Sequence, residues 1–193
     1  MRRILRLLAC GAVVLSLVAC TPTGRAVGDT QDSMPSIAHD STHKTDITVG
    51  FVGSTDTAAD KKAIDALADD TLNVYYASLD TSGDSETADK IAATAQQGVT
   101  DFVDRAVKIV IISGIDVTDA NRDSWNQALT NAREAGIPVA LLNPKHAPED
   151  ELLYAAILNT DDAASAKSVS IADAVIIIAR DEPHDRTIAV ATE

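Results

Sequence analysis

Short apolar runs and longer amphipathic segments alternate along the chain from residue 47 onward. The apolar runs are rich in Val, Ile and Tyr, a composition typical of strands that are buried on at least one face. These runs predict five strands, at 47–52, 72–79, 109–112, 139–142 and 154–158.

Helical periodicity fills the segments between these runs. Apolar residues recur every three or four positions in 60–70, 91–106 and 119–135, and Gly136 and Pro138 mark the end of the third segment. Strands that alternate with helices are typical of βαβ units, in which parallel strands are joined by right-handed crossovers. The pattern therefore predicts an α/β fold with a doubly wound parallel sheet.

Residues 1–19 follow a different pattern. Arg2, Arg3 and Arg6 precede an apolar run that ends in small residues, and the segment contains no acid. This arrangement predicts a secretory signal peptide. The apolar run is too short for a membrane-spanning helix, which needs about 20 apolar residues. The letters Leu-Val-Ala-Cys at 17–20 resemble the lipobox of bacterial lipoproteins. That resemblance implies cleavage before Cys20 and attachment of fatty acids such as palmitate to its thiol.

Residues 20–46 are expected to be a flexible, lipid-anchored linker. They are rich in Thr, Ser, Asp, Gly and Pro and show no apolar periodicity. A flexible chain of this length has a root-mean-square reach of roughly 25–30 Å. The lipid would hold the protein at the extracytoplasmic face of the cell membrane, since each buried CH₂ contributes about 0.8 kcal/mol.

Charge and cysteine content narrow the range of partners. The formal net charge of −13 argues against nucleic acid, because a phosphate backbone needs clustered Lys and Arg. Removing the three Arg of the signal leaves 13 basic residues against 29 acidic ones, a formal charge of −16. Anionic headgroups would repel such a surface, so attachment must depend on the lipid. With Cys10 cleaved off and Cys20 acylated, neither a disulfide nor a free thiol is expected.

Polar residues directly follow the predicted strands. In an open parallel sheet, ligands bind beyond the carboxyl ends of the strands. This rule selects as the default ligand-binding residues Ser54, Thr55, Asp56, Asp80, Ser113 and Asn143. Each of them, taken alone, is also explained as a turn or helix-capping residue.

Motifs for catalysis and for cofactors are absent from the sequence. The first strand is not followed by the three glycines of a dinucleotide site, and neither a phosphate-binding loop nor G-x-S-x-G occurs. His146 and His184 lack the spacing of a metal site, and His39 and His43, at i and i+4, lie in a segment without a helical pattern. The acids are scattered over helix faces and turns. The sequence thus predicts no catalytic residue, no metal and no cofactor. Trp125 lies on an apolar helical stripe, which favours packing over stacking on a sugar.

Several segments resemble a known family. The stretches 109–113, 125–129 and 132–142 are similar to the amino-terminal lobe of sugar-binding proteins of the ribose/galactofuranose type. These proteins are the extracytoplasmic receptors of ABC importers and have the type I periplasmic-binding fold. The similarity extends to 97–104, 155–161 and 187–192. It implies a sugar ligand, an ABC permease as partner, and a ligand-binding role for Asp161 at the crossover between two lobes.

The resemblance also implies a division of the chain. After the signal peptide and the linker, residues 47–161 would form the amino-terminal lobe, and 162–193 the helix and first strand of a truncated second lobe. The helix expected at 162–180 carries the apolar run 175–178. Its apolar face would pack on the first lobe, pair with a second copy in a homodimer, or stay poorly ordered.

Three departures from the family pattern keep a second function open. The first is the truncation of the expected second lobe, which leaves half of the family's ligand contacts without residues to make them. Asn143-Pro144 stands where the family has an acidic and a basic residue, and 54–60 contains no aromatic residue. Loss of charge-assisted hydrogen bonds, about 1.5–3 kcal/mol each, would weaken sugar binding. The leading hypothesis is the solute receptor of a sugar importer. The alternative is a lipid-anchored interaction module, or a non-binding remnant of such a receptor.

Overall fold

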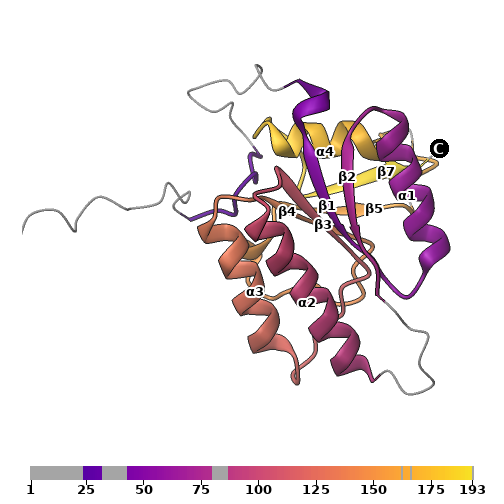
Figure 1. Ribbon diagram of the computed structural model, residues 1–193. Helices are drawn as coiled ribbons and strands as arrows, with labels where there is room; N and C mark the ends of the chain where they lie inside the picture. Colours follow the sequence, from indigo (N-terminus) through magenta and orange to yellow (C-terminus); the bar gives the residue numbers. More distant parts are fainter. Residues whose placement is uncertain (1–23, 32–42, 80–86, 162, 166, 193) are drawn as a thin grey trace, which may run out of the picture.

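The computed structural model describes residues 24–31, 43–79, 87–161, 163–165 and 167–192. Within them, one parallel sheet has the strand order β2-β1-β3-β4-β5-β7-β6 (Figure 1). The strands are β1 Thr48–Val52, β2 Asn73–Ala77, β3 Ile109–Ser113, β4 Val139–Leu142, β5 Ala156–Asn159, β6 Val169–Ser170 and β7 Thr187–Ala191. The predicted α/β fold and the parallel sheet are confirmed, and the structure adds the two-residue β6.

Helices cover both faces of the sheet. They are α1 Thr57–Asp69, α2 Ala88–Asp104, α3 Arg122–Glu134 and α4 Ile171–Ala179, with short 3₁₀ turns at Lys44–Asp46 and Glu151–Leu153. Helices α1 and α4 pack on one face, and α2 and α3 pack on the other (Figure 1). The predicted doubly wound arrangement is therefore confirmed. Among the described residues, no helix is both long and apolar enough to cross a membrane.

The central strand β3 shows how the sequence pattern produces this arrangement. All five of its residues are buried. Ile109 and Ile111 belong to the core beneath α1 and α4, whereas Val110 and Ile112 belong to the core beneath α2 and α3. Because successive side chains of a strand point to opposite faces, a strand covered on both sides needs an unbroken apolar run.

The carboxyl-terminal segment completes this same sheet. β7 pairs in parallel with β5, with Ile157 opposite Thr187. The expectation that 162–193 begins a second lobe is wrong for its described residues, because β7 finds its hydrogen-bonding partner in the first lobe.

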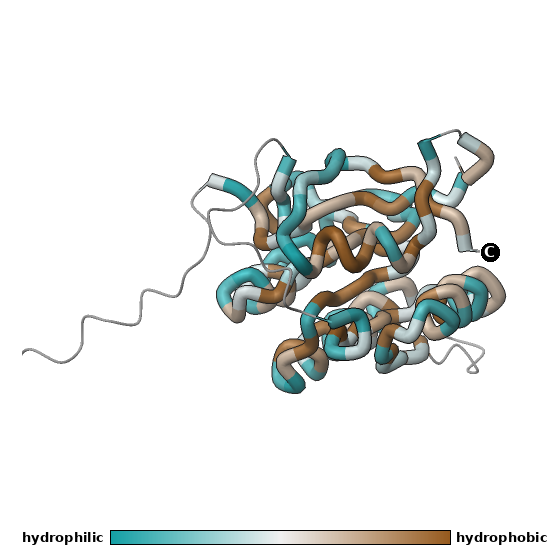
Figure 2. The backbone as a smooth tube through the Cα atoms, turned by 90° about the horizontal axis from the view of Figure 1, so that it is seen from above, coloured by the Kyte–Doolittle hydropathy of each residue, from teal (hydrophilic) through white to brown (hydrophobic). Residues whose placement is uncertain are grey.

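Helix α4 is shorter than the predicted helix 162–180 and lies on the sheet. It begins at Ile171, where the side chain of Ser170 accepts a hydrogen bond from the amide of Asp173 at 2.9 Å. Its strongly hydrophobic sequence, brown in Figure 2, is buried against the sheet on the face shared with α1. The homodimer expected through this helix therefore lacks its basis, since the face that needed cover is already covered.

Part of the expected flexible linker also packs on the domain. In the segment 24–31, Thr30 is fully buried and Ala26 is 2% exposed. The prediction of a solvated tether over 20–46 is wrong for these residues, because they find specific polar partners near the start of β7.

We expect Ile178→Ala to lower the free energy of unfolding by about 2–5 kcal/mol, because this side chain is 1% exposed in the core under α4. Ile177→Ala is the matched control, since the side chain of Ile177 is only partly buried. Urea titration followed by circular dichroism measures both. Equal losses for the two variants would contradict the packing of α4 on the sheet.

Candidate functional site

The carboxyl ends of β1, β3 and β4 meet at one edge of the sheet, as a parallel arrangement requires. Two hollows open at this edge. The larger, here called the α1 cleft, has a volume of about 620 Å³ and lies beside the start of α1. Its polar lining residues are Asp56, Lys62, Ser113, Asn143, Thr160 and Thr192.

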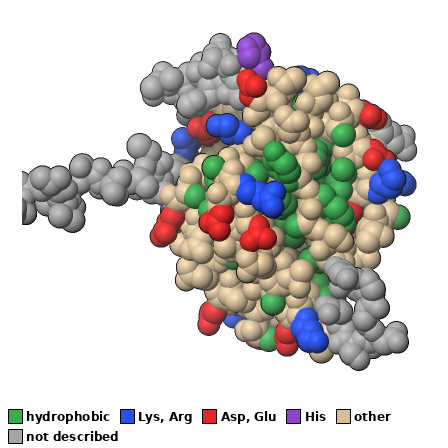
Figure 3. Space-filling model, in the orientation of Figure 1, with side chains coloured by type: hydrophobic (Ala, Val, Ile, Leu, Met, Phe, Trp, Pro, Cys, Tyr) green, Lys and Arg blue, Asp and Glu red, His purple; other side chains and the backbone are tan. Residues whose placement is uncertain are grey.

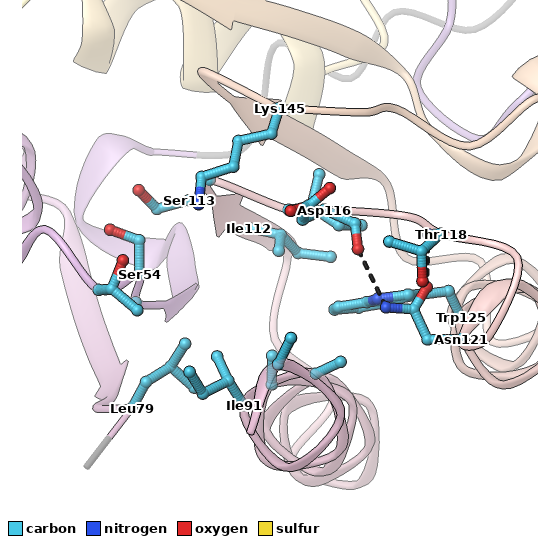
Figure 4. A pocket seen from close by; sticks show the side chains of 17 residues that line it. Ser54, Leu79, Ile91, Ile112, Ser113, Asp116, Thr118, Asn121, Trp125 and Lys145 are labelled. Carbon is cyan, nitrogen blue, oxygen red and sulfur yellow. Dashed lines mark hydrogen bonds between the residues drawn. The ribbon is translucent and has the colours of Figure 1, made fainter. Parts of the chain in front are cut away.

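The smaller hollow, here called the Trp125 pocket, lies between the sheet and the helices α2 and α3. Its volume is about 120 Å³, and its walls are mostly apolar (Figure 4). Ser113 lines both hollows, and Lys145 extends toward Ser113 at the mouth of the Trp125 pocket. Trp125 is 2% exposed and packs in the core, as its position on the apolar stripe predicted.

The turn between β1 and α1 is held by Asp60, which sequence reasoning did not select. This carboxylate is 1% exposed. It accepts hydrogen bonds from the Ser54 amide at 2.6 Å and from the Ser54 hydroxyl at 3.0 Å. Only its place in the first turn of a helix, before the apolar stripe, could have indicated such a role.

Ser54 and Asp56 have structural partners of their own. The Ser54 hydroxyl accepts a hydrogen bond from the Asp56 amide at 3.0 Å, and the Asp56 carboxylate caps α1 by accepting one from the amide of Ala59 at 3.0 Å. This cap also explains why α1 begins at Thr57, earlier than the predicted start at residue 60. Ser54 therefore acts as a turn residue and Asp56 as a helix cap, as the sequence pattern allowed for each of them.

Asn143 joins the ends of β4 and β5. Its side-chain amide donates to the Thr160 hydroxyl at 2.7 Å, and its carbonyl oxygen accepts from the Thr160 backbone amide at 2.9 Å. Asn143 has a φ of 45°, a left-handed conformation that Asn tolerates better than most residues. Thr160 was not selected from the sequence, because nothing in the linear pattern pairs it with Asn143.

The selected residues do not form a single site. Asp56, Ser113 and Asn143 line the α1 cleft, and Ser54, Thr55 and Ser113 line the Trp125 pocket. Asp161 is exposed beyond β5 and lines neither hollow; its amide donates to the side chain of Asn159 at 2.8 Å. Asp80 and Cys20 lie outside the described residues.

An aromatic side chain reaches the end of β1 from the neighbouring strand. Tyr76 of β2 is 43% exposed, and a methyl group on Gly53 would lie 2.8 Å from its hydroxyl oxygen. Hydrophobic side chains gather over the β1–β2 region in Figure 3. Tyr75 and Tyr76, both on β2, are the exposed large hydrophobic residues of the described chain. The register of β1 and β2, which sequence alone does not specify, brings Tyr76 to this edge.

The described residues contain no group of three or more His, Cys, Asp or Glu placed to hold a metal ion. Apart from the indole of Trp125, the polar side chains that line the two hollows carry hydroxyl, amide, carboxylate and ammonium groups.

Comparisons with known proteins give likenesses of fold. No protein-family model and no curated protein matches the sequence. One similar solved structure is a protein from Mycobacterium smegmatis in complex with β-D-fucofuranose, with TM-score 0.47 and 18% identity over 64% of this chain and 42% of that chain. Another is a galactofuranose binding protein, with TM-score 0.46 and 17% identity over 74% of this chain and 56% of that chain.

A third is the periplasmic binding protein component of the arabinose ABC transporter from Shewanella sp. ANA-3, bound to α- and β-L-arabinofuranose. Its TM-score is 0.42, with 15% identity over 74% of this chain and 54% of that chain. The chain thus spans about half the length of these proteins.

We expect Asp60→Ala to lower the free energy of unfolding by about 2–3 kcal/mol, because it leaves the amide and hydroxyl of Ser54 without their acceptor. Asp65→Ala is the control: this exposed carboxylate forms a surface ion pair with Lys61, and its loss should cost less than about 1 kcal/mol. Thermal unfolding measures both variants. Similar losses for the two would show that the turn does not depend on Asp60.

Proposed function

We propose that this chain is an extracytoplasmic, lipid-anchored solute-binding protein of an ABC importer, and that a sugar binds in the α1 cleft. The observation that carries the proposal is the cleft itself. A carboxylate, an ammonium group, a hydroxyl and an amide converge on about 620 Å³ at the carboxyl edge of the sheet, from Asp56, Lys62, Ser113 and Asn143. This volume lies within the range of about 300–1,000 Å³ found for small-molecule sites.

The chemistry of these groups suits a polyol. Sugar hydroxyls both donate and accept hydrogen bonds, Lys62 can only donate, and Asp56 can only accept when ionised. Asn143 and Thr160 are bonded to each other, yet the amide keeps a second N–H and the Thr160 hydroxyl keeps its own hydrogen for a ligand. Hydrogen bonds to charged groups contribute about 1.5–3 kcal/mol each, so Lys62 and Asp56 would supply most of the polar affinity.

The importer and membrane parts of the proposal rest on the sequence. The segments 109–113, 125–129 and 132–142 resemble receptors of this kind, and the amino end has the pattern of a lipoprotein signal ending at Cys20. An ABC permease would then be the partner that accepts the solute.

One observation favours a second candidate, a lipid-anchored interaction module that binds no solute. Ser54, Asp56 and Asn143 already make hydrogen bonds within the protein. A ligand in the cleft would compete with these internal bonds at Asp56 and Asn143.

We expect isothermal titration to detect binding of a pentose or hexose, with the furanose-forming sugars arabinose and galactose tested first. Lys62→Ala should weaken the affinity about tenfold, equivalent to about 1.4 kcal/mol. Lys108→Ala is the control, since Lys108 is an exposed cation just before β3, at the opposite edge of the sheet. An absence of heat at millimolar sugar with folded protein would favour the interaction module.

We expect radiolabelled palmitate to enter the protein when the full chain is expressed in a bacterium that processes lipoproteins. Cys20→Ser should abolish the label, because the acylated thiol is removed. Cys10→Ser should keep it, because Cys10 lies inside the predicted signal peptide. Label that persists in Cys20→Ser would refute lipid attachment at this residue.

A further inference from the structure

Residues 24–31, here called the strap, are fastened to the domain by a buried ion pair. The Asp29 carboxylate, on a side chain 7% exposed, accepts a hydrogen bond from the Arg186 guanidinium at 2.5 Å. Arg186 is held in turn by the backbone oxygen of Glu151 and lies 4.5 Å above the ring of Tyr154. These contacts orient the arginine toward the strap.

The backbone of the strap is held as well. Its Thr30 carbonyl accepts a hydrogen bond from the His184 amide at 2.8 Å, and the imidazole Nε2 of His184 lies 2.7 Å from the Gly28 carbonyl oxygen. The Thr30 hydroxyl donates to the carboxylate of Asp181. Nearer the amino end of the strap, the Arg25 carbonyl accepts a hydrogen bond from the Arg133 side chain at 3.1 Å.

One position in the strap accepts glycine alone. Gly28 has a φ of 77°, a left-handed conformation that other residues rarely adopt. A methyl group built on it would lie 2.8 Å from the Cβ of Pro138. The close approach of the strap to the domain therefore depends on this residue.

The strap lies at the edge of the sheet where strands begin. Arg186 directly precedes β7, Tyr154 lies two residues before β5, and Pro138 directly precedes β4. The α1 cleft and the Trp125 pocket lie at the other edge, where strands end. In Figure 1 the strap is the indigo segment that runs past the end of α4.

Resting on the lipid anchor proposed at Cys20, we infer that the strap orients the protein on the membrane. It holds the strand-start edge toward the lipid surface and leaves the α1 cleft facing away from it. Cys20 precedes Gly24 by four residues, and a chain of four residues spans at most about 14 Å. A free linker over 20–46 would instead reach roughly 25–30 Å and let the domain rotate. Docking of the strap therefore shortens the flexible connection between the anchor and the domain.

Energy transfer from the protein to the membrane tests this orientation. The full chain is produced as the lipoprotein, reconstituted in phosphatidylcholine vesicles that carry an acceptor lipid, and labelled on one introduced cysteine. Glu134→Cys places the donor dye at the carboxyl end of α3, near the strap, and Asp161→Cys places it beyond β5 at the cleft edge. With an anchor of at most about 14 Å, transfer from position 134 should be about twofold or more above that from 161.

We expect Gly28→Val to remove the docking, because a side chain at this position would clash with Pro138. In this background the difference between positions 134 and 161 should disappear, and the amide of His184 should exchange its hydrogen about tenfold faster. Gly24→Asn is the matched control, because no atom lies within 4 Å of a Cβ at that position and Asn tolerates its left-handed backbone (φ 78°) better than most residues. It should leave both readouts unchanged.

The outcomes separate the inference from the proposals on which it rests. Equal transfer from the two positions in the acylated wild type, or an unchanged difference in Gly28→Val, would overturn the inference. Absence of palmitate would overturn the anchor and the inference with it, whereas absence of sugar binding alone would leave the orientation standing.

Discussion

The two-sided burial of one parallel sheet is the constraint on which the whole molecule depends. A strand such as β3, with all five residues buried, is stable only if both faces of the sheet are covered. All four covering helices lie in crossovers between successive strands, with α4 joining β6 to β7. The fourth, α4, comes from the carboxyl-terminal segment and buries its isoleucines beside α1. The same demand explains why β7 joins this sheet beside β5 instead of beginning another.

The edge where the strands end shows how little of a polar cluster is free for a ligand. The carboxylate of Asp60 accepts hydrogen bonds within the β1–α1 turn, and hydrogen bonds between Asn143 and Thr160 link the loops after β4 and β5. These bonds preorganise the edge, because the loops around the α1 cleft are held in place before any ligand arrives. Lys62 and the remaining hydrogen-bonding capacity of Asp56, Ser113 and Asn143 then define the chemistry of the cleft.

Under the proposed function, the strap would give the two edges of the sheet different tasks. The edge where strands begin receives the chain that leads from the proposed anchor, and the edge where strands end carries both hollows. A parallel sheet provides this separation directly, since all its strands start on one side and finish on the other. Anchoring and solute binding would therefore not compete for surface.

Much of the fold follows from the sequence alone. The apolar runs and the helical periodicity predicted β1 to β5 and α1 to α3 to within a few residues, because a strand or helix must present its apolar side chains with a fixed period. The rule that ligands bind beyond strand ends selected Asp56, Ser113 and Asn143, which do line the α1 cleft. The sequence pattern was sufficient for residues whose position is fixed by the strand or helix to which they belong.

Tertiary structure decided everything that depends on pairing between distant segments. Asp60 meets Ser54, Thr160 meets Asn143, and Tyr76 reaches the end of β1 only through the turn and register geometry of the folded sheet. Asp29 meets Arg186 across 157 residues, so the composition of the linker pointed to a solvated tether although part of it is docked. The physical reason is that periodicity records which side of an element is buried, whereas the partner on that side is set by the packing of the whole chain.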